Sequence, residues 1–256
     1  MPAGRTTVIK IGGSTLGAED TTLEDVAALQ RAGERVVVVH GGGAMITDWL
    51  SKMDVPSEFV DGLRSTSAEA INVVVAVLRG VINAQLVAQL GARGATAVGL
   101  CGVDGGLVRA ERYDARLGYV GQITGVNGAL LNALLDAGVV PVIAPIGLEA
   151  PDQPLNINAD TVAGEVARAI EAKHLVFLTD VDGLMDASGA VIEHLTAADA
   201  EALRSAGTIA GGMIPKVEAC FRATEGSGVA IMANGRTPGT LRRIVNGEQL
   251  GTRIEA

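Results

Sequence analysis

Short runs rich in β-branched residues alternate along this chain with longer stretches rich in Ala and Leu, and this alternation limits the possible folds more than any other feature. Runs of five or six residues that are apolar at nearly every position are typical of strands buried on both faces of a sheet. We expect such strands at 6–11, 35–40, 96–100, 139–143, 175–179 and 228–232.

The stretches between these runs have helical spacing, at 22–32, 44–52, 67–90, 128–137, 160–172 and 216–226. Strands and helices that alternate in this way form βαβ crossovers, in which a helix crosses one face of the sheet to the next parallel strand. We therefore expect an α/β fold with an open, mostly parallel central sheet sandwiched by helices. A loop-like, proline-containing segment at 150–154 interrupts the pattern, so we expect two lobes, 1–150 and 151–256.

Charge and composition exclude several classes of partner. The formal net charge is −9, whereas nucleic acids and anionic membranes require dense Lys and Arg. Aromatic residues make up only 2% of the chain, which leaves few platforms for stacking bases. The apolar runs fall short of the roughly 18 residues that a membrane span needs. We expect no nucleic-acid partner and no membrane partner.

The cysteines and histidines carry little chemistry of their own. Cys101 and Cys220 form no CxxC pattern and no signal-like segment follows the amino terminus, so we expect a cytoplasmic protein. His40, His174 and His194 are isolated and lack the spacing of zinc ligands, so we predict no metal site built from protein side chains.

Two of the four lysines stand beside glycine-rich turns. Lys10 ends the first apolar run and precedes Gly12 and Gly13, and Lys216 closes the segment Gly-Gly-Met-Ile-Pro-Lys. A further run, His-Gly-Gly-Gly at 40–43, ends the second predicted strand. Glycines let backbone N–H groups approach an anion, and a lysine adds a mobile positive charge. The chain has neither a Walker P-loop nor G-x-G-x-x-G after the first strand, so these segments indicate phosphoryl transfer outside both common nucleotide motifs.

Two polar segments complete the pattern. Asn156, Asn158 and Asp160 precede a predicted helix, where capping accounts for one or two of them but does not require three. Their amides suit an amide or carboxylate on a small substrate, and Asp160 is suited to hold two lysines by charge-assisted hydrogen bonds. Asp180 and Asp182 follow a strand at the edge where open α/β sheets bind ligands; we interpret this loop as nucleotide-binding, with an Asx-turn as the alternative.

The order of these motifs resembles the amino acid kinase family, and within it the branch that phosphorylates N-acetyl-L-glutamate in arginine biosynthesis. The resemblance covers essentially the whole chain. It rests on Lys-Ile-Gly-Gly at 10–13, Val-His-Gly-Gly-Gly at 39–43, Asp-Gly-Leu-Arg at 61–64, Val-Gly-Leu-Cys-Gly-Val-Asp-Gly at 98–105, Asn-Ile-Asn-Ala-Asp at 156–160, Thr-Asp-Val-Asp-Gly at 179–183 and Gly-Gly-Met-Ile-Pro-Lys at 211–216.

The resemblance implies a role for each matching residue. Lys10 and Lys216 would straddle the transferring phosphoryl group as catalytic residues, with Asp160 orienting both. The lobe at 1–150 would bind the acyl acceptor, and the lobe at 151–256 would bind ATP, with Mg²⁺ held through the ATP phosphates. The implied acceptor-binding set is Gly42, Gly43, Arg64, Asn156 and Asn158. The implied ATP-binding set is Gly12, Gly13, Asp180, Val181, Asp182, Gly183, Leu184, Met185, Thr208, Ile209, Ala210 and Met213.

The implied reaction joins two anions, because the γ-carboxylate of N-acetyl-L-glutamate attacks the γ-phosphorus of ATP. A carboxylate is already ionised at neutral pH, so no general base is needed. The segment at 62–67, Gly-Leu-Arg-Ser-Thr-Ser, departs from the Arg-Val-Thr-Asp pattern that is more usual after the glycine, which leaves the approach of Arg64 less defined than its presence.

Three alternatives remain beside this interpretation. A sibling kinase acting on carrier-bound α-aminoadipate or glutamate expects a basic rim, which a chain of net charge −9 fits poorly. Carbamate, aspartate and nucleotide-monophosphate kinases share the lobe order but not the paired His-Gly-Gly-Gly and Asn-x-Asn-Ala-Asp segments. A non-catalytic binding protein with this fold would be expected to lose Lys10, Lys216 or Asp160, and all three are present.

The helix predicted at 67–90 bears on assembly. Its segment at 72–78 is apolar on nearly every side, which predicts either a central core helix or a helix that packs in part against a second subunit. The chain begins only a few residues before its first strand, without the extra amino-terminal helix that is typical of arginine-sensitive hexamers of this branch. We therefore expect an arginine-insensitive homodimer.

Overall fold

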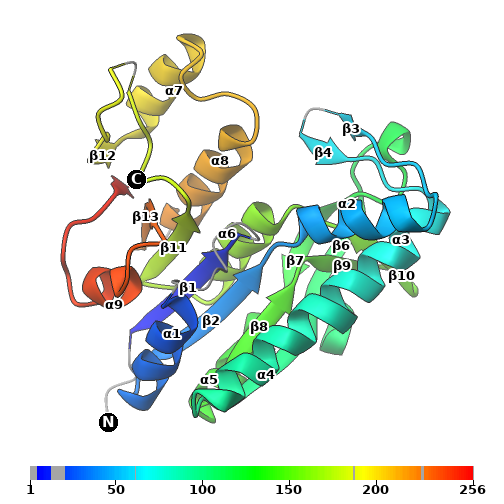
Figure 1. The fold of residues 1–256 in the computed structure, drawn as a ribbon, viewed down its shortest axis with the longest axis horizontal. Helices are drawn as coiled ribbons and strands as arrows, with labels where there is room; N and C mark the ends of the chain where they lie inside the picture. Colours follow the sequence, from blue (N-terminus) through cyan, green and yellow to red (C-terminus); the bar gives the residue numbers. More distant parts are fainter. Residues whose placement is uncertain (1–4, 13–20, 61, 187, 226–227, 256) are drawn as a thin grey trace.

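The computed structural model describes residues 5–12, 21–60, 62–186, 188–225 and 228–255. Its central sheet has eight strands in the order β12-β14-β13-β11-β1-β2-β8-β5 (Figure 1). Neighbouring strands are parallel except for β13 and β14. The strands are β1 (Thr6–Ile11), β2 (Arg35–His40), β5 (Ala97–Cys101), β8 (Val140–Ala144), β11 (His174–Thr179), β12 (His194–Leu195), β13 (Val229–Asn234) and β14 (Thr252–Ile254).

Helices bury both faces of this sheet, and because side chains alternate along each strand, one strand contributes to both cores. In β1, Ile9 and Ile11 belong to one hydrophobic core and Val8 to the other. The first core is completed by α1 (Thr22–Arg31), α2 (Gly43–Lys52), α3 (Ala68–Val75), α4 (Ala84–Ala92) and α9 (Thr240–Val245). The second is completed by α5 (Gly128–Asp136), α6 (Ala159–Ala169), α7 (Ala197–Ser205) and α8 (Met213–Thr224). The predicted fold class is therefore confirmed.

The longest helical segment is continuous from α3 through a π-helical stretch, Ala76–Asn83, into α4. Ser67 begins it by accepting a hydrogen bond from the backbone N–H of Ala70. By length and composition this helix could cross a membrane, with a mean hydropathy of 1.8, yet half of its most apolar window is buried inside the fold. Its buried side supplies much of the first core, as one of the two sequence interpretations expected.

A second, smaller sheet and a hairpin were not among the predicted elements. The small sheet has the order β10-β9-β6-β7, and the two-stranded hairpin pairs β3 with β4. Their bounds are β3 (Phe59–Val60), β4 (Leu63–Arg64), β6 (Val108–Arg112), β7 (Gly121–Val126), β9 (Ile146–Glu149) and β10 (Gln153–Asn156).

The predicted lobe boundary at residue 150 lies in the turn between β9 and β10, which pair as an antiparallel hairpin. Strand β10 therefore packs with the small sheet of the amino-terminal half. In Figure 1 the elements after α6, coloured yellow to red, gather on the β11 side of β1, and those from β2 to α5 gather on the other side. The division into an acceptor lobe and an ATP lobe stays a prediction.

The strand order places several motifs at one edge of the sheet. Because β1 is parallel to both β2 and β11, their carboxyl ends lie together, with Lys10 paired in register with Phe177 and Ile11 with His40. The chain leaves β1 toward β2 on one side and returns to β11 on the other. Such a switch point is where open α/β sheets bind ligands.

Candidate active site

One buried carboxylate joins both lysines that the sequence singled out. Lys10 Nζ lies 2.8 Å from Asp160 Oδ1, and Lys216 Nζ lies 2.8 Å from Asp160 Oδ2. The three residues come from β1, from the first turn of α6 and from α8. Side-chain exposure is 12% for Lys10, 16% for Lys216 and 10% for Asp160, so the cluster is shielded from water but open at one side.

Burial and mutual charge act in opposite directions within this cluster. Burial by itself would raise the pKa of Asp160, but the two ammonium groups outweigh it and hold that pKa below its ordinary value. Burial lowers the pKa of Lys10, Asp160 opposes this effect, and the charge of Lys216 adds to it. Lys216 also lies over the ring of Phe177, with Nζ 5.4 Å from the ring centroid. The cluster carries an excess positive charge, which an anion would neutralise.

The close approach of α6 and α8 brings Asp160 to Lys216. Gly164 lies one turn after Asp160 on α6 and faces Ala219, which lies three residues after Lys216 on α8. A Cβ atom at Gly164 would be 2.7 Å from the Ala219 carbonyl oxygen, so only glycine allows this separation of the helices. At the start of α6, Asn158 Oδ1 accepts hydrogen bonds from the backbone N–H groups of Asp160 and Thr161, at 2.8 and 3.2 Å.

A cavity of about 260 Å³ opens beside Lys10 and Asp160. All five residues of the predicted acceptor set line it, and so does Pro145, which follows β8. Asn156 is held in place by a hydrogen bond from its Nδ2 to Thr66 Oγ1, at 3.1 Å. The volume suits a small acid, and the lining combines amide, guanidinium and backbone groups. The predicted acceptor residues on its lining are Gly42, Gly43, Arg64, Asn156 and Asn158.

Arg64 is held from several sides at the wall of this cavity. Its Nη2 donates to the Gly43 carbonyl oxygen at 2.9 Å and to Thr47 Oγ1 at 2.7 Å, and its Nη1 donates to Ser57 Oγ. Its guanidinium also lies 4.5 Å from the centroid of the Phe59 ring. Hydrogen bonding and ring stacking together fix the plane of the guanidinium, which lysine could not reproduce.

The glycine turn after β2 begins helix α2. Gly42 is the N-cap of α2 and Gly43 its first residue, and both line the cavity. The first N–H groups of a helix lack partners inside the helix, so this terminus presents donors and a partial positive charge to an anion. The turn is tied to β1 by a hydrogen bond from the Gly41 N–H to the Ile11 carbonyl oxygen, at 3.0 Å.

The predicted ATP-binding residues divide between surface and core. In the loop after β11, Asp182 Oδ1 accepts a hydrogen bond from Asn234 Nδ2 at 2.9 Å, and Asp180 lies 3.8 Å from Arg236. Leu184 is only 2% exposed and belongs to the second core, so its side chain is a packing residue. Next to it, the Val181 carbonyl oxygen accepts a hydrogen bond from Thr179 Oγ1. A Cβ atom at Gly183 would lie 2.7 Å from Thr252 Oγ1, so this position is tightly packed, whereas Met185 is 39% exposed.

The second ATP-binding segment joins α7 to α8. Ile209 is 3% exposed and also belongs to the second core, whereas Ala210 is exposed and Thr208 and Met213 are partly buried. Met213 begins α8, the helix that carries Lys216, and its backbone N–H donates to the Ala210 carbonyl oxygen at 3.1 Å. This segment therefore connects directly to the lysine cluster.

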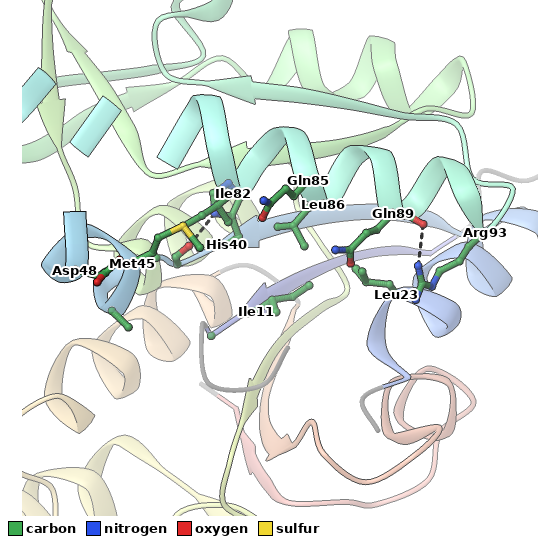
Figure 2. A pocket seen from close by; sticks show the side chains of 14 residues that line it. Ile11, Leu23, His40, Met45, Asp48, Ile82, Gln85, Leu86, Gln89 and Arg93 are labelled. Carbon is green, nitrogen blue, oxygen red and sulfur yellow. Dashed lines mark hydrogen bonds between the residues drawn. The ribbon is translucent and has the colours of Figure 1, made fainter. Parts of the chain in front are cut away.

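Gly12 lies on the other side of the glycine turn from the acceptor cavity. It lines a separate cavity of about 580 Å³, and Gly13 falls outside the described residues. Figure 2 shows this larger cavity between β1, α2 and α4, with Ile11, Ile82 and Leu86 among its walls and Gln85 and Gln89 along α4. Gly12 does not line the smaller cavity, but Gly41 and Gly42 line both cavities and so connect the two.

Sequence reasoning missed the residues that hold Arg64. Ser57, Thr47 and Phe59 stand in no recognisable motif, and they meet Arg64 only because the hairpin β3–β4 folds back over α2. It also missed the packing role of Gly164, although a glycine inside a predicted helix is a signal of close approach.

Comparison with known proteins gives concordant results. A model described as "Amino acid kinase family" matches residues 5–232. A curated acetylglutamate kinase of Dehalococcoides mccartyi is 40% identical over 253 residues, which is 96% of this chain and 93% of that protein. One of Geobacillus kaustophilus is 49% identical over 222 residues, which is 86% of each. The crystal structure of smu.665 from Streptococcus mutans UA159 has a TM-score of 0.85 at 30% identity and covers 98% of both chains.

Proposed function

The chain belongs to the amino acid kinase family, and we propose that it transfers the γ-phosphoryl group of ATP to the γ-carboxylate of N-acetyl-L-glutamate, the second step of arginine biosynthesis. One observation carries the proposal: a single buried carboxylate holds two lysines beside a cavity sized for a small acid. The names of the similar curated proteins support the choice of acceptor.

The proposed chemistry is electrostatic. A carboxylate and a phosphate must meet in line, and Lys10 and Lys216 offset the charge that builds up between them. Each carboxylate oxygen of Asp160 lies 2.8 Å from one lysine ammonium, so its role is to orient the two lysines rather than to accept a proton. The acceptor carboxylate is ionised near neutral pH and needs no base.

The acceptor is recognised at both of its ends. In the described part of the chain, the terminal nitrogens of Arg64 donate to Ser57, Thr47 and the Gly43 carbonyl oxygen. Because a guanidinium has five N–H donors, donors are left over for a substrate carboxylate. Asn156 and Asn158 supply amide groups that match an acetamido group. The N-terminus of α2 accommodates the phosphoryl oxygens between the acceptor and Lys10.

ATP is proposed to lie along the loops that follow β11 and α7, in the carboxy-terminal lobe. Mg²⁺, bound together with ATP, would supply further positive charge to offset that of the phosphates. Asp160 is committed to two ammonium groups, so we assign the ion to the phosphates rather than to this carboxylate.

The test measures ATP-dependent formation of an acyl phosphate, trapped as the hydroxamate. We expect product with N-acetyl-L-glutamate and none with glutamate, aspartate or α-aminoadipate. Lys10→Ala should lower kcat by at least about a hundredfold, as expected for the loss of one transition-state charge. Lys52→Ala is the matched control, because Lys52 has a side-chain exposure of 70% and pairs only with the surface residue Asp48 in the described structure. Product with another free acid, or full activity of Lys10→Ala, would reject the proposal.

We also propose that the protein forms a homodimer through the exposed side of the α3–α4 helix. Half of the most apolar window of this helix is not buried within one chain, and the helix packs against β5, which is an edge strand of the central sheet. Light scattering should give twice the chain mass of 26.0 kDa. A monomer or a hexamer would contradict this assembly.

A further inference from the structure

The motif at 98–105, Val-Gly-Leu-Cys-Gly-Val-Asp-Gly, has no part in the function proposed above, since none of its residues lines the acceptor cavity. It lies on the edge strand β5 and the turn that follows, where it faces the π-helical segment Ala76–Asn83. The contacts made from there lead through the buried side chains of Asn83 and His40 to the glycine turn of the candidate active site.

His40 ends β2 immediately before the glycine turn and is 1% exposed. Its Nε2 lies 3.1 Å from Asn83 Nδ2, and its Nδ1 lies 2.9 Å from the Gly41 carbonyl oxygen. Asn83 Nδ2 also donates to the Val142 carbonyl oxygen at 2.9 Å, which identifies that atom as the amide nitrogen. Nε2 of His40 must therefore accept, so Nδ1 carries the proton and donates to Gly41. Burial lowers the pKa of His40 to about 4, so the ring stays neutral at pH 7 and Nε2 stays free to accept from Asn83.

Asn83 is held from its other side by the unassigned motif. Its Oδ1 accepts a hydrogen bond from Arg79 Nη1 at 3.2 Å. Arg79 Nε lies 3.4 Å from Asp104 Oδ2, which also accepts from the Cys101 N–H at 2.7 Å. A Cβ atom at Gly99 would be 2.0 Å from Asn83 Oδ1, so residue 99 must be glycine for Asn83 to occupy this position.

The same helical segment touches the glycine turn directly. A Cβ atom at Gly42 would be 2.5 Å from Ile82 Cδ1 and 2.7 Å from Leu78 Cδ2. Ile82 and His40 lie close together at one end of the larger cavity (Figure 2). Asn83 and Ile82 thus contact two successive parts of the turn, and π-helical stretches of this kind are frequent at functional sites.

The peptide plane explains what this contact achieves. The Gly41 carbonyl and the Gly42 N–H belong to one peptide unit, and in a trans peptide they point in opposite directions. A carbonyl held by His40 therefore turns the Gly42 N–H away from His40. Gly42 is the N-cap of α2 and lines the acceptor cavity.

We propose that His40 and Asn83 are positioning residues. They orient the Gly41–Gly42 peptide so that the N–H groups at the start of α2 face the transferring phosphoryl group. Gly99 and the Arg79–Asp104 pair hold Asn83 in the place that this role requires. The proposal rests on the kinase function proposed above. It predicts that the motif at 98–105 acts on turnover without touching either substrate.

The test compares steady-state kinetics of His40→Leu and His40→Asn. His40→Leu removes the donor to Gly41 and should lower kcat about tenfold to a hundredfold, with the KM for N-acetyl-L-glutamate changed less than about threefold. In His40→Asn the amide nitrogen takes the place of Nδ1, so kcat should recover to within about threefold of wild type. His194→Leu is the matched control, because His194 lies exposed on β12, and it should match wild type.

Arg79→Ala probes the far end of the network in a residue that is 37% exposed and whose loss leaves the core intact. It should lower kcat by about threefold to tenfold, and hydrogen exchange of residues 41–46 in the free protein should become faster. Unchanged kcat in both His40→Leu and Arg79→Ala would overturn the proposal, and so would equal losses in His40→Leu and His40→Asn. A wild-type protein without kinase activity would instead reject the proposed function, while the exchange measurement would still test the network.

Discussion

Replacing Gly164 by alanine should separate α6 from α8 and so loosen the contact between Asp160 and Lys216. The added Cβ would lie 2.7 Å from the Ala219 carbonyl oxygen, 3.0 Å from its Cα and 3.1 Å from its Cβ. Two of these atoms belong to the backbone, which a rotamer change cannot move. The helices must therefore shift by about 0.5–1 Å to restore ordinary contact.

Two effects set the expected size. Overpacking of a close contact costs about 1–3 kcal/mol, and alanine gains back up to about 1 kcal/mol of helix propensity. We expect a net loss of up to about 2 kcal/mol in the free energy of unfolding. A misplacement of about 1 Å at a catalytic group can cost up to a hundredfold in rate, so kcat should fall by about tenfold or more.

The matched control is Gly91→Ala in α4, where nothing lies within 4 Å of the added Cβ. This variant should gain up to about 1 kcal/mol with unchanged kcat. Urea unfolding followed by circular dichroism gives the stabilities, and the hydroxamate assay gives kcat. If the two variants shift stability by the same amount and in the same direction, or if Gly164→Ala keeps wild-type kcat, the packing argument is refuted.

Four further predictions follow from the same structure. Asp160→Asn leaves two shielded ammonium groups without their partner and should lower the free energy of unfolding by about 3–5 kcal/mol in urea titrations at pH 7; a change below about 1 kcal/mol would contradict this. Arg64→Lys loses the fixed guanidinium plane and should raise the KM for the acceptor at least about tenfold while the KM for ATP stays constant, so parallel changes in both would argue against the assignment. Since the native pKa of His40 is about 4 against 6.5 unfolded, only the unfolded state gains a proton at this side chain between these values, and the contribution of His40 to stability should fall by up to about 3 kcal/mol from pH 6.5 to pH 4. The pKa of His174 is also about 4 and adds a fall that His40→Asn retains, so an identical pH dependence in wild type and His40→Asn would disprove the role of His40. Burial raises the pKa of both Cys101 and Cys220, so a maleimide should label neither thiol in the native protein and both in urea, and rapid native labelling would contradict the fold.

Local sequence patterns anticipated the elements that have strong local signals. Each predicted strand of the central sheet is present, and its bounds agree within two residues. The contact of Lys10 and Lys216 with Asp160 is also present, because parallel strands and their following helices converge at one edge of a sheet. The roles assigned to these residues stay predictions.

The small sheet had no comparable signal. Strands such as Val108–Arg112 and Gln153–Asn156 are short and partly polar, so their composition resembles that of loops. They form because partners distant in sequence supply hydrogen bonds, and β6 joins both β7 and β9. Helices α7 and α9 were missed because they are short and polar over much of their surface.

The contacts around the candidate active site are the part that only the folded chain defines. His40 and Asn83 are 43 positions apart, and nothing in either neighbourhood indicates their hydrogen bond. Arg64 likewise meets Thr47 across 17 positions. The sequence by itself determined most strands of the central sheet, the longer helices between them and the chemical groups that the chain carries, because hydrophobic periodicity and glycine-rich turns act over a few residues. Tertiary packing decided how those groups are aimed, because the helix separations, the closure of the hairpin over the cavity and the orientation of single peptide planes depend on contacts between distant segments.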